Sequence, residues 1–142
     1  MPWREVSEGS CVAEMAERTT VFIVDQDDGV RRALCRLMEA ARFETVCLDS
    51  MDALLEYPLP DHDAVIVADV RTVRGPSETL PACLHGRTTR LPVIYTTDYD
   101  TNPARREARR LGAAGYFRRP LDQQALVDAI NFAVLNQHNG KA

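Results

Sequence analysis

Five short apolar segments recur along the chain, and most end at a polar residue. They are residues 20–24, 45–48, 64–68, 92–96 and 115–117. Their residues are mostly β-branched, aromatic or alanine, without polar alternation, which is typical of strands covered on both faces. The segment Ala64–Ala68 ends abruptly on Asp69. We predict that it is the central strand of a parallel sheet, with Asp69 at the carboxyl edge of that sheet.

Segments with helical periodicity separate these strands. Between residues 30 and 41, apolar residues at i, i+4, i+7, i+8 and i+11 form one face of a helix, and Asp28 is its expected N-cap. A second helix begins at Ser50 and ends before Pro58. A later helix has Asn102 as its expected N-cap and is stopped by Gly112.

The remaining segments complete an alternating pattern. An irregular stretch at 71–76 and a weak helix at 77–84 follow the central strand. In the last helix, five apolar side chains are predicted to face the core: Leu121, Leu126, Ile130, Ala133 and Val134. Five strands alternating with five helices imply parallel crossovers and a doubly wound α/β sheet. We expect one domain over residues 19–137, with tails at 1–18 and 138–142.

Polar side chains stand where four of these strands end. They are Asp25, Asp69, Thr97 and Arg119, after the first, third, fourth and fifth strands. Because the carboxyl ends of parallel strands share one edge, these side chains should converge. Mg²⁺ takes one or two carboxylates and otherwise keeps water or phosphate oxygens, while a hydroxyl and a cation neutralise phosphoryl oxygens. The four side chains therefore suit Mg²⁺ and a phosphoryl group.

Composition narrows the class of partner and the compartment. The 142 residues carry a formal charge of −4 at pH 7, which gives no reason to expect nucleic acid or an anionic membrane. No apolar stretch reaches membrane-spanning length, and the N-terminus lacks the order of a signal peptide. The four cysteines, Cys11, Cys35, Cys47 and Cys83, show no CxxC and no metal spacing. We expect reduced thiols in a cytoplasmic protein.

Five motifs follow one another along the chain. They are Val21–Asp25, Val65–Arg71, Leu91–Thr97, Leu111–Ala114 and Tyr116–Pro120. In this order and near this spacing, they make residues 20–137 resemble a receiver domain of the two-component response-regulator family. The resemblance implies a flavodoxin-like (CheY-like) five-stranded sheet of order 2-1-3-4-5 and a role in phosphorelay signal transduction. It also implies a cis peptide bond before Pro120.

The resemblance implies roles for the residues at the strand ends. Asp69 matches the aspartate that accepts a phosphoryl group from a histidine kinase or phosphotransfer protein. Thr97 and Arg119 match the hydroxyl and cationic residues that engage this group. Tyr116 matches the aromatic switch residue whose rotamer follows that engagement.

The resemblance also implies a Mg²⁺ site, with one departure. Asp25 matches the first residue of the family's acidic pair, and the expected ligand set adds Asp69, Gln26 and the backbone carbonyl of Arg71. Gln26 stands where the family has a second acid. A neutral amide lacks the charge attraction that makes a hard-cation site tight, so we expect weak Mg²⁺ binding.

Two further departures concern Asp69. Arg119 stands at the family's lysine position, and a planar, bidentate guanidinium can clamp Asp69 directly. Val73 and Ser77 occupy loop positions where the family usually has proline and glycine. Two alternatives therefore stay open. In one the receiver accepts a phosphoryl group on Asp69, if weakly; in the other it is a pseudo-receiver that binds proteins constitutively, with Arg119 locked on Asp69.

Simpler interpretations exist beside these two. Asp69 and Arg119 could form a structural ion pair, Thr97 could cap a strand end, and Tyr116 could belong to the core; convergence at one edge favours a site. A small flavodoxin-like enzyme or nucleotide binder is disfavoured, because no glycine-rich phosphate loop follows the first strand. We expect no enzyme activity beyond the receiver's own phosphoryl transfer and dephosphorylation.

A basic surface indicates where a partner binds. Arginines cluster on the helix that starts at Asn102: Arg105, Arg106, Arg109 and Arg110. The resemblance places the output surface on this helix, the strand 115–117 and the last helix. We expect a downstream protein target there, or a homodimer in which Asp122 and Asp128 pair with the arginines. Because the chain ends soon after the last helix, we expect a single-domain regulator.

Overall fold

The computed structural model describes residues 19–73 and 91–139. Five strands form one sheet in the order β2-β1-β3-β4-β5, and every neighbouring pair is parallel. The strands are β1 (Thr20–Val24), β2 (Glu44–Leu48), β3 (Ala64–Asp69), β4 (Val93–Thr97) and β5 (Gly115–Arg118). The helices are α2 (Asp28–Ala40), α3 (Met51–Glu56), α4 (Val70–Val73), α6 (Asn102–Arg110) and α7 (Gln123–Asn139). The predicted doubly wound sheet and its strand order are confirmed.

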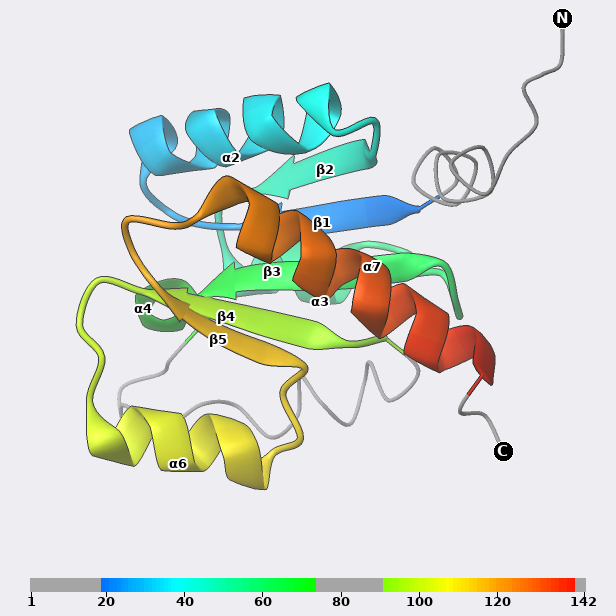
Figure 1. Cartoon of the computed structure of the whole chain (residues 1–142). Helices are drawn as coiled ribbons and strands as arrows, with labels where there is room; N and C mark the ends of the chain where they lie inside the picture. Colours follow the sequence, from blue (N-terminus) through cyan, green and yellow to red (C-terminus); the bar gives the residue numbers. More distant parts are fainter. Residues whose placement is uncertain (1–18, 74–90, 140–142) are drawn as a thin grey trace, which may run out of the picture.

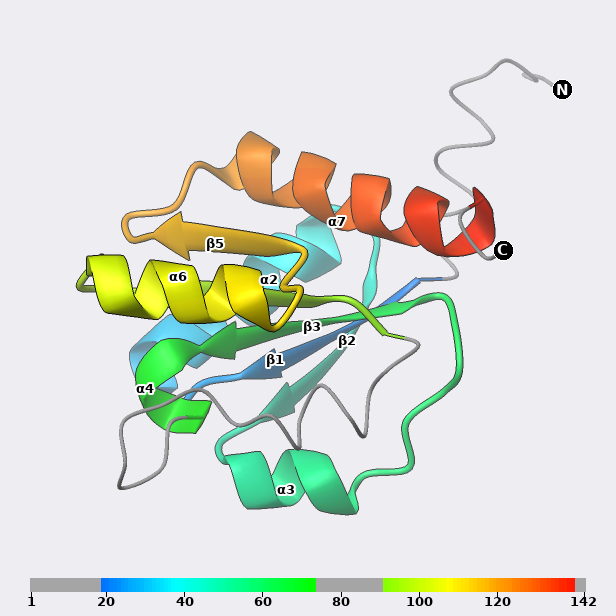
Figure 2. The same ribbon diagram turned by 90° about the horizontal axis from the view of Figure 1, so that it is seen from below.

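The sheet is covered on both faces, as the apolar strands predicted (Figures 1 and 2). On one face α2 and α7 pack against strand residues such as Ile23 and Val67. On the other face α3 and α6 pack against the alternate residues, among them Phe22 and Ile66. All six residues of β3 are buried, so it is the central strand in burial as well as in order. Alternation between the two faces decides which polar groups meet at the strand ends.

Several predicted element boundaries are corrected by the structure. Asp27, not Asp28, is the N-cap of α2, because its side chain accepts the backbone N–H of Val30 at 2.9 Å. Thr101, not Asn102, caps α6. Residues 71–73 of the predicted irregular stretch instead belong to one helical turn, α4, which follows Asp69 directly, and residues 74–76 lie outside the described residues. The predicted stop of α6 is confirmed.

Gly112 supports that stop, since its φ of 82° lies in the left-handed region that glycine adopts without strain. The peptide bond between Arg119 and Pro120 is cis, as the resemblance implied. The weak helix predicted at 77–84, the loop position Ser77 and the two cysteines Cys11 and Cys83 lie outside the described residues.

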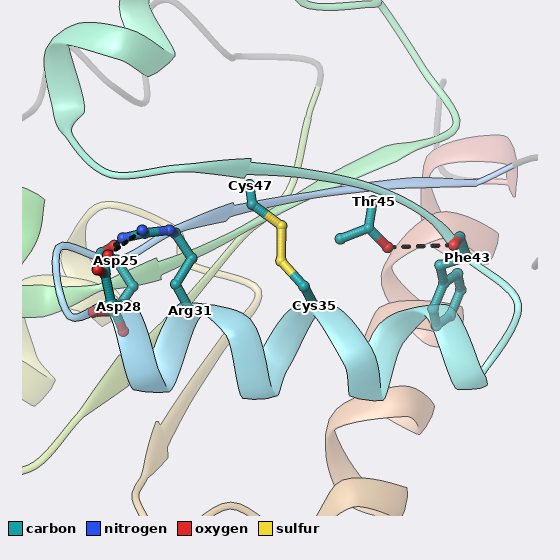
Figure 3. The surroundings of a disulfide bond; sticks show 7 residues. All are labelled: Asp25, Asp28, Arg31, Cys35, Phe43, Thr45 and Cys47. Carbon is teal, nitrogen blue, oxygen red and sulfur yellow. Dashed lines mark hydrogen bonds and ion pairs between the residues drawn. A yellow bond between two sulfur atoms is a disulfide. The ribbon is translucent and has the colours of Figure 1, made fainter.

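The expectation of reduced thiols is wrong for one pair of cysteines. Cys35 on α2 and Cys47 on β2 form a disulfide across a Cα–Cα distance of 6.7 Å (Figure 3). Because α2 packs against the edge strand β2, the fold brings together two cysteines that no short sequence motif connects. One turn before Cys35, Arg31 donates from Nη1 to the backbone carbonyl of Asp25 at 2.8 Å and pairs with Asp28. The disulfide therefore fixes the helix whose first turn borders the carboxyl edge of the sheet.

Across the part of the chain that the structure describes, no helix combines the length and apolar character needed to cross a bilayer.

Candidate functional site

Asp69 ends the central strand with both carboxylate oxygens engaged. Its side chain is only 5% exposed. Oδ1 accepts a hydrogen bond from Arg119 Nη2 at 2.6 Å. Oδ2 accepts from the backbone N–H of Thr72 at 3.0 Å and from the hydroxyl of Thr72 at 3.1 Å. Asp69 thus caps the helical turn α4 with one oxygen and pairs with a cation through the other.

Arg119 reaches this edge from the end of β5 and is held at three points. Besides its bond to Asp69, Nη1 donates to the hydroxyl of Thr96 at 2.7 Å and Nε donates to Asp98 at 2.9 Å. Burial alone would lower the pKa of Arg119, but the hydrogen bonds to Asp98 and Asp69 raise it above its ordinary value. The guanidinium therefore stays charged and fixed in orientation.

Asp25 lies next to this pair with one oxygen unsatisfied. Its residue is 2% exposed, and Oδ1 accepts the backbone N–H of Asp27 at 2.9 Å. Oδ2 is buried without a hydrogen bond from any described residue, and Arg119 Nη1 lies 3.7 Å away. Burial raises the pKa of Asp25, and repulsion from Asp69 adds to the effect, while the Asp27 amide and Arg119 partly offset it. A cation bound next to this oxygen would stabilise its negative charge.

The site carries more negative than positive charge at its centre. Three carboxylates, those of Asp25, Asp69 and Asp98, pair with the guanidinium of Arg119, and the charge of Arg71 also acts on Asp98. The hydrogen bond from Arg119 lowers the pKa of Asp98. Each of these acids is therefore within reach of one shared cation, which cannot neutralise all three.

Thr97 and Tyr116 belong to the opposite side of the sheet. The Thr97 hydroxyl donates to the backbone carbonyl of Tyr99 at 2.8 Å and accepts its N–H at 3.0 Å, which closes a tight turn. The Tyr116 hydroxyl is buried without a well-formed hydrogen bond among the described residues. Burial raises the pKa of Tyr116, an effect that the nearby backbone of Thr101 and side chain of Thr97 partly offset.

Strand alternation explains why Arg119 binds Thr96 and not the neighbouring Thr97. Thr96 is the register partner of Asp69, and their side chains share one face of the sheet. Thr97 points to the other face, toward the side of Tyr116. The structure therefore brings Asp25, Asp69 and Arg119 into one cluster and places Thr97 with Tyr116 in a second layer.

Three contributing residues were missed from the sequence. Asp98 stands one residue after the fourth strand, so the same reasoning that selected Thr97 could have found it. Period-two alternation along β4 could have grouped Thr96 with Asp69. The role of Thr72 could not be predicted from the sequence, since it depends on the helical turn α4. Its hydroxyl also accepts the backbone N–H of Gln26 at 3.0 Å, which ties the loop after β1 to the loop after β3.

The residues present fit a Mg²⁺ ion in part. Residues 19–73 and 91–139 contain no group of three or more His, Cys, Asp or Glu side chains placed to hold a metal. Mg²⁺ needs only one or two carboxylates, and the unsatisfied Oδ2 of Asp25 next to Asp69 provides such a pair. The side chain of Gln26 is exposed, and Arg71, whose carbonyl completes the expected ligand set, places its guanidinium 5.1 Å above the Tyr99 ring.

The family profile described as the response regulator receiver domain matches residues 21–131. This chain belongs to the response regulator receiver family. The transcriptional regulatory protein FixJ of Azorhizobium caulinodans is 32% identical to it over 116 residues, which are 82% of this chain and 55% of that protein. Among solved structures, the response regulator StyR matches with a TM-score of 0.73 and 27% identity, over 87% of this chain and 63% of StyR.

A structure titled FixJ-N also matches this receiver, with a TM-score of 0.68 and 26% identity, over 82% of this chain and 94% of that structure. The receiver spans about half the length of the FixJ protein that it matches. Receiver domains of two-component systems interact with histidine kinases or phosphotransfer proteins, generally bind Mg²⁺ in an acidic pocket, and serve as signalling modules rather than enzymes. The predicted family is thereby confirmed.

Proposed function

We propose that this receiver accepts a phosphoryl group on Asp69 from the phosphohistidine of a histidine kinase or phosphotransfer protein, and signals through contacts with another protein. The observation that carries the proposal is the unsatisfied, buried Oδ2 of Asp25 beside a carboxylate that already has a fixed cation. An acid oxygen without a hydrogen bond, next to a second carboxylate, is suited to bind a metal ion together with phosphoryl oxygens. No such gap is needed in a purely structural ion pair.

The chemistry follows from the positions of the side chains. A carboxylate oxygen of Asp69 attacks phosphorus, the phosphorus–nitrogen bond of the donor breaks, and the donor histidine takes up a proton. Nη2 of Arg119, which lies 2.6 Å from Asp69 Oδ1, donates to a phosphoryl oxygen as the negative charge of the carboxylate passes to the phosphoryl group. Asp25 and Asp69, with weaker help from Gln26 and the Arg71 carbonyl, would hold a Mg²⁺ ion, whose charge would neutralise phosphoryl oxygens.

Thr97 and Tyr116, the second layer of the site, can transmit a conformational change from Asp69 to the surface. For the Thr97 hydroxyl to bond a phosphoryl oxygen, it has to leave the carbonyl of Tyr99, which it now contacts at 2.8 Å. That release opens the turn at the start of α6. Tyr116, whose buried hydroxyl lacks a well-formed bond in the described structure, can then change its rotamer toward the space that Thr97 leaves. The switch role of Tyr116 is part of the proposal.

The proposed output surface is the face formed by α6, β5 and α7. Arg105 and Arg110 on α6 pair with Asp100 and Glu107, so their charge is partly neutralised. Three exposed arginines of this face make no ion pair within the described residues: Arg106, Arg109 and Arg118. Acidic groups of a target, or of a second copy of the receiver, are the complementary chemistry.

One observation favours the pseudo-receiver alternative. Both oxygens of Asp69 are engaged, one by Arg119 and the other by Thr72. If these bonds persist in the presence of Mg²⁺, the acceptor stays blocked. The protein would then bind its partner constitutively through the same face.

Phosphorylation by a small donor separates the two functions. The purified chain is incubated with acetyl phosphate and Mg²⁺, and intact mass is measured over time. The proposal predicts one added phosphoryl group, which is absent in Asp69→Asn and retained in Asp28→Asn, a control that removes an exposed carboxylate of the same edge. An unmodified wild-type mass at every donor concentration contradicts phosphorylation and leaves the constitutive binding module.

A further inference from the structure

Arg119 does not hold Asp69 as an unrestrained arginine would hold a carboxylate. A guanidinium facing a carboxylate normally forms two parallel N–H···O bonds. Here Asp69 receives one, from Nη2 at 2.6 Å. Nε, which has a single N–H, donates it to Asp98 at 2.9 Å, so the edge formed by Nε and Nη2 is not available to Asp69. Nη1 donates to the Thr96 hydroxyl at 2.7 Å.

The two competing acceptors come from the same strand end. Thr96 is the register partner of Asp69, and Asp98 follows two residues later, beyond the end of β4. Thr96 is 1% exposed, whereas the side chain of Asp98 is 53% exposed. Asp98 therefore reaches the guanidinium from the solvent side and Thr96 from the interior. Between them they fix its plane.

We propose that Asp98 is a positioning residue that makes Arg119 act on Asp69 through one N–H, as a lysine would. Asp98 keeps the second oxygen of Asp69 out of the guanidinium fork, so this oxygen stays with Thr72 and the acceptor is not chelated. Arg119 and Asp98 act as a matched pair, because Arg119 leaves the site open only while Asp98 holds its Nε. The effect of Asp98 on phosphorylation rests on the proposed function. The effect of Asp98 on the orientation of Arg119 does not.

The decisive experiment is a double-mutant cycle between Asp98 and Arg119. Rates of phosphorylation by acetyl phosphate are measured for the wild type, Asp98→Ala, Arg119→Lys and the double variant. Without Asp98, Arg119 forks onto Asp69, and the rate falls about tenfold, the size of effect expected for one charge-assisted hydrogen bond. In the Arg119→Lys background, Asp98→Ala changes the rate by less than about twofold, because an ammonium cannot form the fork.

Two matched variants test the chemistry of the contact. Asp98→Asn keeps an oxygen acceptor for Nε without the charge and restores part of the rate. Asp100→Asn removes a neighbouring carboxylate that pairs with Arg105 and leaves the rate unchanged. The proposal is overturned if Asp98→Ala lowers the phosphorylation rate equally in the wild-type and Arg119→Lys backgrounds. It is also overturned if Asp98→Ala does not lower the rate when Arg119 is present.

An independent readout works even if the chain accepts no phosphoryl group. Hydrogen exchange at the Arg119 Nε–H is followed by ¹⁵N NMR in the apo protein. In the wild type this proton is bonded to Asp98 and should exchange about tenfold more slowly than in Asp98→Ala. Slow exchange in the wild type without phosphorylation retains the positioning and rejects the proposed function. Equal exchange in the two proteins rejects the positioning.

Discussion

The two halves of the site differ in how well their charges are partnered. The half built from the end of β1 holds Asp25, a buried acid whose Oδ2 has no hydrogen bond from the described residues. The half built from the ends of β4 and β5 holds Arg119, a guanidinium with hydrogen bonds to three different residues. The first half reaches the charge of Arg119 only across 3.7 Å, whereas the second half holds the same guanidinium by three hydrogen bonds.

This difference shows where the departures from the family matter. Gln26 removes a negative charge from the half that contains Asp25, where a bound cation would have few charged ligands. Arg119 adds donors to a half that contains the acceptors to use them, Thr96 and Asp98. The arginine is therefore accommodated by its surroundings. Among the described residues no acid compensates for the glutamine, because Asp27, the next residue, is exposed and caps α2.

The largest expected effect comes from breaking the well-partnered half. Arg119→Ala leaves the buried carboxylates of Asp25 and Asp69 without their cation and should lower the free energy of unfolding by about 3–5 kcal/mol. Urea denaturation measures the change. Arg118→Ala, next to it but exposed, should change stability by less than about 0.5 kcal/mol. Equal values for the two variants would show that Arg119 is not the cation that stabilises this edge.

The next effect concerns the helix that supports the weakly partnered half. Reduction of the Cys35–Cys47 disulfide, which closes a sequence separation of 12, should lower the free energy of unfolding by about 3 kcal/mol through loop-closure entropy. Urea denaturation with and without a thiol reductant measures it. The variant that carries both Cys35→Ser and Cys47→Ser should not respond to the reductant. Titration of four free thiols in the unreduced, unfolded chain would rule the bond out.

A smaller effect, of opposite sign, comes from removing the charge of Asp25, whose Oδ2 has no hydrogen bond from the described residues and lies 3.7 Å from Arg119 Nη1. The pKa of Asp25 is raised, so the folded state binds this proton more tightly than the unfolded state. The ionised group therefore costs stability above its folded pKa, and the cost shrinks as pH falls through that value. Asp25→Asn should stabilise the protein at pH 7 by about 1–2 kcal/mol, the scale of an unsatisfied buried polar group.

The pH profile sharpens the comparison between the halves. The stabilisation by Asp25→Asn should decline toward acid pH, as measured by urea denaturation at several pH values. Asp98 has a lowered pKa, so its contribution is present above the ordinary aspartate value and is lost as pH falls through the folded value. A destabilising Asp25→Asn at neutral pH would contradict the view that Arg119, 3.7 Å away, only partly compensates the charge of Asp25.

Much of the fold and part of the site could be predicted from the sequence. Apolar strands without alternation and their polar ends sufficed to predict the sheet, its central strand, and the convergence of Asp25, Asp69 and Arg119. Which of the two neighbouring hydroxyls, that of Thr96 or that of Thr97, shares a face with Asp69 could not be settled in this way. It depends on which face each residue of β4 presents, and therefore on the register that pairs Thr96 with Asp69.

Other features depend on contacts that sequence spacing does not encode. The turn α4 begins where Asp69 accepts the Thr72 N–H, so its start depends on the same carboxylate that marks the site. The disulfide depends on how α2 packs on β2, and its two cysteines match no short motif. The engagement of Arg119 by Asp98 depends on side-chain reach beyond the end of a strand.

The central claim is that the unpartnered oxygen of Asp25 and the single-point contact of Arg119 leave Asp69 able to accept a phosphoryl group. An amide-resolved NMR titration with Mg²⁺, followed by beryllofluoride as a mimic of the phosphoryl group, tests it most directly. We predict Mg²⁺-dependent shifts at Asp25 and Asp69, then shifts at Thr97, Tyr116 and α6 when beryllofluoride is added. Gln26→Asp should saturate at a lower Mg²⁺ concentration, by about tenfold, because it restores a charged ligand. A spectrum unchanged at saturating Mg²⁺ and beryllofluoride would contradict the claim and identify the chain as a receiver whose site is closed by Arg119.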